Sequence, residues 1–134
     1  MGMSLEIAEK LSSGALKKAR ELGIGITVAV VDAAGHIRHL ARMDDAGWLS
    51  PDIAIAKAYA TAGFRRDTEQ MLQRLKGKEV FATALTSMSG GKVLLGQGGC
   101  LVMDGDEIIG AIGVSGATSE QDAECAQAGV AGLG

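Results

Sequence analysis

Aromatic residues are scarce in this sequence, whose 134 residues include one Trp, one Tyr and two Phe. The formal net charge is −3, and Lys and Arg form no cluster. Nucleic-acid-binding surfaces need basic patches and aromatic stacking platforms. No apolar run approaches the roughly 20 residues that span a bilayer, and the N-terminal segment, with its acidic positions, is no signal peptide. We therefore expect a cytoplasmic protein that binds neither nucleic acid nor membrane.

Cysteine and proline are also rare, with two Cys and one Pro, whereas Gly is abundant at 20 residues. Cys100 and Cys125 form no C-x-x-C pair, so we expect both to be reduced core thiols and expect no metal site. With so few aromatic residues, the core must consist of Ala, Val, Ile, Leu and Met, with backbones approaching closely. The length fits a single domain over residues 1–134.

Hydrophobic periodicity and turn residues predict the order helix, two strands, two helices, three strands, helix. Apolar residues recur every three or four positions in the helical segments, and β-branched residues are frequent in the strands. Residues 80–89 have no decisive period, and we expect them to be irregular. The expected helices are 4–22, 50–64, 68–75 and one opening at 118, and the expected strands are 24–31, 36–43, 92–95, 100–103 and 107–115.

Capping and turn residues support these boundaries. Ser50 is expected to be an N-cap with Pro51 at the first helical position, and Thr118 with Gln121 makes a capping box. Asp104-Gly105 is a strong hairpin signal. Short turns between neighbouring strands favour antiparallel pairing over a Rossmann arrangement. We therefore expect an α/β (α+β) fold with a five-stranded, mainly antiparallel sheet flanked by helices.

Lys57 is the only charged residue between positions 53 and 64, and alanines flank it on both sides. A lysine on an otherwise buried helix needs an anionic partner or must give up its charge, and both conditions recur where carboxylates are bound or an amine does chemistry. Alternatively, its stem lies along the edge of the core while the ammonium group reaches water. Both interpretations stay open.

Arg42 and Asp44 end the second predicted strand before a glycine-containing loop, which is a common place for polar site groups. The alternative is an exposed Arg42–Asp44 pair that contributes about 0–1 kcal/mol. His36 and His39 have an odd spacing and should point to opposite faces of a regular strand, so they cannot share a metal ion. Either histidine could serve alone as a haem axial ligand.

Two glycine-containing segments are further site candidates. Gly96-Gln97-Gly98-Gly99 matches neither a Walker loop nor a dinucleotide fingerprint, but it lets a ligand or a neighbouring backbone approach closely. Gly116-Ala117-Thr118-Ser119 presents backbone N–H groups at a helix N-terminus, either as a carboxylate cradle or as an ordinary cap. No serine lies in a G-x-S-x-G elbow, so a hydrolase triad is unsupported.

Three stretches together resemble the GlcG/HbpS-like family of small haem-binding or haem-degrading proteins, which also includes the C-terminal domain of PduO-type proteins. They read ITVAVVDAAGHIRHLARMDDA, SPDIAIAKAYATAGFRRDT and DGDEIIGAIGVSGATSEQDAECA. The resemblance implies a profilin-like three-layer fold and homo-oligomers, from dimers to rings such as octamers. Members are linked to haem or corrinoid binding, to iron-dependent sensing and to several catabolic operons, so the resemblance alone implies no single activity.

The resemblance also implies which residues form the ligand pocket. The family's G-G-x-P segment reads Gly98-Gly99-Cys100-Leu101 here, without the proline, and no axial haem ligand can be transferred. Positions that match the recurrent motifs are Arg42, Asp44, Lys57, Gly98, Gly99, Ser115 and Gly116.

Three functions compete at this stage. The first is an oligomeric binding protein for haem or a related tetrapyrrole, with Arg42 and Lys57 pairing to ligand carboxylates. The second is a cofactor-free enzyme acting on a small carboxylic or aromatic metabolite, with Lys57 or Asp44 as acid or base. The third is an accessory subunit that binds nothing small.

Overall fold

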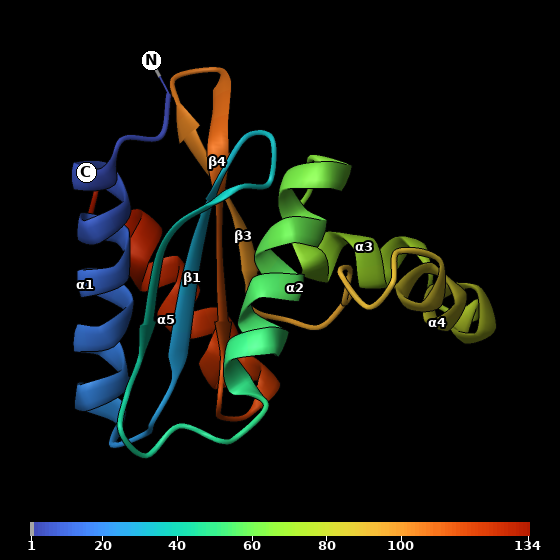
Figure 1. Cartoon of the computed structure of the whole chain (residues 1–134), viewed down its shortest axis with the longest axis horizontal. Helices are drawn as coiled ribbons and strands as arrows, with labels where there is room; N and C mark the ends of the chain where they lie inside the picture. Colours follow the sequence, from blue (N-terminus) through green and yellow to red (C-terminus); the bar gives the residue numbers. More distant parts are fainter. Residues whose placement is uncertain (1) are drawn as a thin grey trace.

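The computed structural model describes residues 2–134, and within them it contains five helices and four strands (Figure 1). The mixed α+β class is confirmed. No helix in residues 2–134 is both long enough and apolar enough to cross a membrane. The elements are α1 (Leu5–Leu22), β1 (Thr27–Asp32), β2 (Ile37–Arg42), α2 (Ser50–Phe64), α3 (Thr68–Arg74), α4 (Glu79–Met88), β3 (Gly99–Asp104), β4 (Glu107–Ser115) and α5 (Ser119–Ala131).

The sheet has four strands, so the prediction of five was wrong. Its order is β2-β1-β4-β3, with every neighbouring pair antiparallel, and residues 92–95 form no strand. The outer edge of β3 is bonded to side chains at the start of α3. Leu101 N–H donates to Asp67 Oδ1 at 2.8 Å, and Gly99 N–H donates to the Thr68 hydroxyl at 3.0 Å. Because these edge N–H groups already have partners, a fifth strand has little to pair with there.

Helices cover both faces of the sheet and give three layers (Figure 1). α1 and α5 pack together on one face, whereas α2 packs on the other, against β1 and β4. A Cβ atom at Gly113 of β4 would lie 2.7 Å from Ala58 N, so this glycine lets α2 approach the sheet closely. The expected close approach of backbones is therefore confirmed. The core on the α2 side consists of small residues: Ala29, Val31, Ala54, Ala58, Ala62 and Ala111.

The boundaries of two helices test the predicted caps. α2 forms as expected, but Ser50 is its first residue and not its N-cap, with Pro51 in the first turn. The Ser50 hydroxyl lies 2.8 Å from the Thr27 hydroxyl and so ties the helix start to β1. The capping box of Thr118 and Gln121 at the start of α5 is confirmed.

Residues 65–92, which we call the arm, contain α3 and α4 and project from the rest of the chain, which we call the body (Figure 1). Residues 80–89 were expected to be irregular, yet almost all of them lie in α4. α4 buries none of its residues. Its sequence therefore lacks the clear alternation of buried and exposed faces by which helices are recognised.

Candidate functional site

Lys57 lies on the face of α2 that packs against the sheet, and only 5% of it is exposed. Its Nζ donates to the Val114 carbonyl at 2.9 Å and to Asp122 Oδ2 at 3.1 Å. Asp122 belongs to α5, which covers the opposite face of the sheet. The ammonium group therefore joins the two helical layers, and its anionic partner is a residue of the same chain.

The second oxygen of Asp122 accepts the Ala117 N–H at 3.0 Å. Ala117 lies in the segment that was considered a cradle for a ligand carboxylate, and the carboxylate found there is the chain's own. Burial raises the pKa of Asp122 above its ordinary value, while the Lys57 ammonium and the Ala117 N–H favour the ionised form and offset part of the rise. The network ties the start of α5 to α2.

The predicted glycines pack around this ion pair. A Cβ atom at Gly98 would lie 2.7 Å from the Val114 carbonyl and 3.2 Å from Lys57 Nζ. A Cβ atom at Gly99 would lie 2.9 Å from the Lys57 carbonyl. Ser115 is buried, and Gly116 has a φ of 137° that suits glycine. The space next to Gly98 and Gly99 is thus filled by the chain's own helix.

Arg42 and Asp44 lie apart from this cluster. Arg42 is exposed at the end of β2, and its guanidinium donates to the Ala46 carbonyl in the following loop. In the sheet register Arg42 pairs with Thr27, which pairs in turn with Ser115, so two strand spacings separate Arg42 from β4. Asp44 is exposed in the same loop. The structure brings the predicted residues on α2, β3 and β4 and in the loops beside them together but leaves Arg42 and Asp44 outside.

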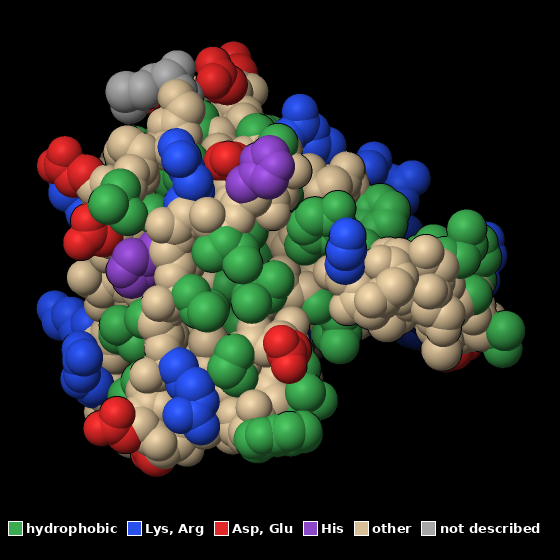
Figure 2. Space-filling model, in the orientation of Figure 1, with side chains coloured by type: hydrophobic (Ala, Val, Ile, Leu, Met, Phe, Trp, Pro, Cys, Tyr) green, Lys and Arg blue, Asp and Glu red, His purple; other side chains and the backbone are tan. Residues whose placement is uncertain are grey.

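A cavity of about 470 Å³ lies between α2, the β1–β2 turn and the returning end of the arm. Figure 2 shows the hollow where the arm leaves the body. Sequence reasoning missed this cavity because its walls come from three separate segments, residues 35–37, 52–59 and 90–92; of the lining residues, only His36 had been considered as a ligand. We call it the His36 groove. Its side chains are Ile37, Ile55, Ala56 and Tyr59 on the apolar side, with His36, Asp52 and Lys92 as polar members.

His36 is placed by the β1–β2 turn. Asp32 accepts the backbone N–H groups of Ala34 and His36, each at 3.0 Å, and its Oδ2 lies 3.6 Å from His36 Nδ1. Burial raises the pKa of Asp32, but the two N–H groups together with the charges of His36 and Arg38 outweigh it, so this pKa lies below its ordinary value. The carboxylate therefore stays ionised beside the imidazole.

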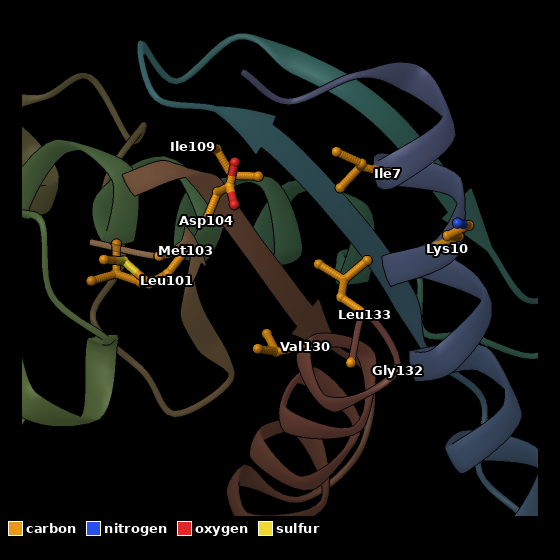
Figure 3. A pocket seen from close by; sticks show the side chains of 11 residues that line it. Ile7, Lys10, Leu101, Met103, Asp104, Ile109, Val130, Gly132 and Leu133 are labelled. Atoms are coloured by element: carbon orange, nitrogen blue, oxygen red, sulfur yellow. The ribbon is translucent and has the colours of Figure 1, made fainter. Parts of the chain in front are cut away.

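A second cavity, of about 580 Å³, lies between α1, the β3–β4 hairpin and the C-terminal end of α5 (Figure 3). Its walls are mainly apolar, and Lys10 and Asp104 are its charged members. Met103 supplies a thioether sulfur, but no imidazole lines this cavity. The His36 groove therefore has the richer set of donor groups.

Comparisons with known proteins agree with the fold. The family described as haem degrading protein HbpS-like matches residues 3–131. Protein GlcG of Escherichia coli strain K12 is 37% identical over 118 residues, which cover 84% of this chain and 81% of GlcG.

Two solved structures extend the likeness. A crystal structure of a Streptomyces reticuli HbpS double mutant has a TM-score of 0.86 at 32% identity and covers 100% of this chain and 88% of that one. The crystal structure of a PduOC:Heme complex has a TM-score of 0.90 at 28% identity and covers 98% of this chain and 95% of that one. The family match spans nearly the whole chain, and the resemblance noted from the sequence is confirmed: this chain belongs to the GlcG/HbpS-like family.

Proposed function

We propose that this protein binds haem or a related tetrapyrrole. The observation that carries the proposal is the likeness to PduOC, whose crystal structure is a haem complex and whose fold matches 98% of this chain. A corrinoid is the second macrocycle that the family resemblance implies. Both ligands combine a flat metal-bearing ring with polar side chains, so both need an apolar slot with polar groups at its rim.

The His36 groove has the chemical groups that a haem needs. A haem site offers apolar walls, an axial ligand and cations for the propionates. Isoleucine and tyrosine side chains supply the walls, His36 supplies an imidazole, and Lys92 supplies a cation. A carboxylate commonly holds one ring nitrogen of a metal-binding histidine and leaves the other for the metal. Asp32 Oδ2 lies 3.6 Å from His36 Nδ1, so the carboxylate is on the Nδ1 side of the ring, and this favours ligation through Nε2.

Arg42 and Lys57 were expected to bind the ligand carboxylates. Arg42 follows His36 by six residues along β2, which is about 20 Å in an extended strand and places it beyond the groove. The Lys57 ammonium is already neutralised by Asp122. We therefore assign the carboxylate contact to Lys92, and a separate anion contact at Arg42 stays a prediction.

A hemin titration of the purified chain tests the function and the site separately. We expect a saturable Soret shift with a stoichiometry of about one hemin per chain. His36 and His39 are the only two histidines. His36→Ala should change the Soret position and weaken binding by about tenfold or more, whereas His39→Ala, the matched control on the same hairpin, should change neither.

The outcomes distinguish two failures. If the wild-type chain shows no saturable Soret shift, the proposed function is wrong. If the His36→Ala variant binds hemin as tightly as the wild type, the proposed function is kept but the assignment of the His36 groove as the site is wrong. Cyanocobalamin in place of hemin, followed by its visible absorption bands, tests the corrinoid alternative with the same variants.

We further propose that the chain acts as a single-domain homo-oligomer in the cytoplasm, as the sequence and the family resemblance led us to expect. The enzymatic alternative, with Lys57 or Asp44 as acid or base, also stays a prediction. Lys57→Ala, assayed on an identified substrate, would test it.

A further inference from the structure

The two ends of the His36 groove differ in chemistry. A Cβ atom at Gly35 would lie 2.9 Å from two ring carbons of Tyr59, so the Tyr59 ring packs on the residue that precedes His36. Asp52 precedes Tyr59 by two helical turns on the same face of α2, which places it about 10 Å away along the helix axis. The imidazole therefore lies at one end of the groove, and a carboxylate lies at the other.

Asp52 and Lys92 are the two formally charged residues among those that line the groove. Both are exposed. Within residues 2–134 no ion pair or hydrogen bond joins the two side chains to each other or engages either of them elsewhere. A ligand in the groove therefore meets one free ammonium group and one free carboxylate at separate places.

The other charges of the β1–β2 hairpin do not line the groove. Arg38 and Arg42 each donate to a backbone carbonyl outside it. Asp32 accepts two backbone N–H groups of the turn. Among the described residues, Asp52 is thus the carboxylate and Lys92 the ammonium group that a ligand in the groove contacts.

Tetrapyrroles differ in where they carry carboxylates. Haem has its two propionates on neighbouring pyrrole rings, so one edge of the macrocycle is anionic and the opposite edge is apolar. A coproporphyrin carries a propionate on each of its four pyrrole rings and has no uncharged edge. With the iron at His36, haem can turn its propionates towards Lys92 and its apolar edge along α2, whereas a coproporphyrin must bring a carboxylate towards Asp52. Like charges brought together in a binding site weaken the complex.

We propose that Asp52 makes the His36 groove selective for tetrapyrroles whose carboxylates lie on one edge of the ring, as in haem, over those with a carboxylate on every pyrrole ring. Specific sites commonly reject a competing ligand through one unfavourable contact of this kind. The inference rests on the proposed haem function and on the His36 groove as its site, and it assigns the residue that decides which macrocycle is bound.

Soret titrations with hemin and with iron(III) coproporphyrin III test this selectivity on the full chain. We expect the wild type to bind hemin more tightly by about fivefold or more. Asp52→Asn should tighten coproporphyrin binding by about fivefold and change hemin binding by less than about twofold.

Glu120→Gln is the matched control for Asp52→Asn. Glu120 is also an exposed acidic residue in the first turn of a helix, but its helix, α5, covers the other face of the sheet. This variant should leave both affinities at their wild-type values. Circular dichroism confirms that each variant is folded.

Salt separates charge repulsion from a steric effect. Exposed charges are screened by salt, so raising the ionic strength from about 0.05 M to about 0.5 M should reduce the preference for hemin more in the wild type than in Asp52→Asn. A preference that salt leaves unchanged would show that shape and not charge excludes the coproporphyrin, and this would overturn the proposal.

The titrations also distinguish this inference from the proposed function. If the wild type shows no saturable hemin binding, the function is wrong and the role of Asp52 is wrong with it. If the wild type binds hemin but binds the coproporphyrin equally tightly, or if Asp52→Asn keeps the wild-type preference, the haem function is kept and the role of Asp52 is wrong.

Discussion

Lys57 and Asp122 are 65 residues apart in the chain, yet their side chains meet at 3.1 Å between helices on opposite faces of the sheet. Both side chains are almost completely buried. The Val114 carbonyl accepts a hydrogen bond from the Lys57 ammonium group, and the Ala117 N–H donates one to the Asp122 carboxylate. Breaking one partner of such a pair leaves an uncompensated charge in the interior, and this is costly even where the intact pair contributes little.

Replacement of Lys57 should therefore be strongly destabilising. Lys57→Met should lower the free energy of unfolding by about 3–5 kcal/mol, measured by urea denaturation at neutral pH. The double variant Lys57→Met with Asp122→Asn removes both charges, so it should lose less than the sum of the two single losses. Additive losses would show that the two side chains do not interact.

The loss in Lys57→Met should also depend on pH. Burial already raises the pKa of Asp122, and removal of the ammonium should raise it further. A carboxyl whose pKa is higher in the folded than in the unfolded state binds a proton on folding, so lowering the pH stabilises the fold. The deficit of Lys57→Met relative to wild type should shrink between about pH 7 and about pH 5. A deficit that is constant or grows over that range would contradict this account.

The contribution of Asp32 to stability should depend on pH in the opposite direction. Its pKa is lowered in the folded state, so it stabilises the fold above the unfolded value of about 3.9 and loses that effect as the pH falls through the lower folded value. Asp32→Ala should cost about 1–3 kcal/mol at pH 7. The difference from wild type should disappear in strong acid. Asp106→Ala, at an exposed position of the β3–β4 turn, is the control and should cost little at any pH.

The two cysteines should be unreactive in the folded protein. Burial raises the pKa of Cys100 to about 12 and that of Cys125 to about 11. Because the thiolate is the reactive form, iodoacetamide at about pH 8 should label neither thiol until the chain is unfolded in urea. Mass spectrometry counts the labels. Rapid labelling of either cysteine under native conditions would show that the core opens locally.

Close packing of α2 predicts contrasting effects at two glycines. Gly113→Ala would place a methyl group 2.7 Å from Ala58 N, and because backbone atoms yield little, the loss should be about 1–3 kcal/mol. Gly63→Ala is the matched control in α2, where nothing lies within 4 Å of the new methyl group. It should be neutral or stabilise by up to about 1 kcal/mol, because alanine favours helix more than glycine does. Thermal unfolding of both variants measures the two stability changes and so separates the effect of tight packing from that of helix propensity.

Elements that pack against the core were predictable from the sequence. We expected α1 from its apolar spacing, β1 from its β-branched residues and α5 from its capping box. All three elements form as expected. α4 escaped prediction because it has no buried face in its own chain.

The sequence by itself indicated the family and the α+β class and singled out Lys57 as a lone charge on a buried helix, with either an anionic partner or an ammonium group in water, because composition, periodicity and a lone charge are local properties. Only the tertiary structure decided that this partner is Asp122, that Asp67 and Thr68 cap the edge of β3, and that His36 shares a groove with Lys92. These contacts join segments more than 30 residues apart, and their geometry is set by how the helices pack on the sheet.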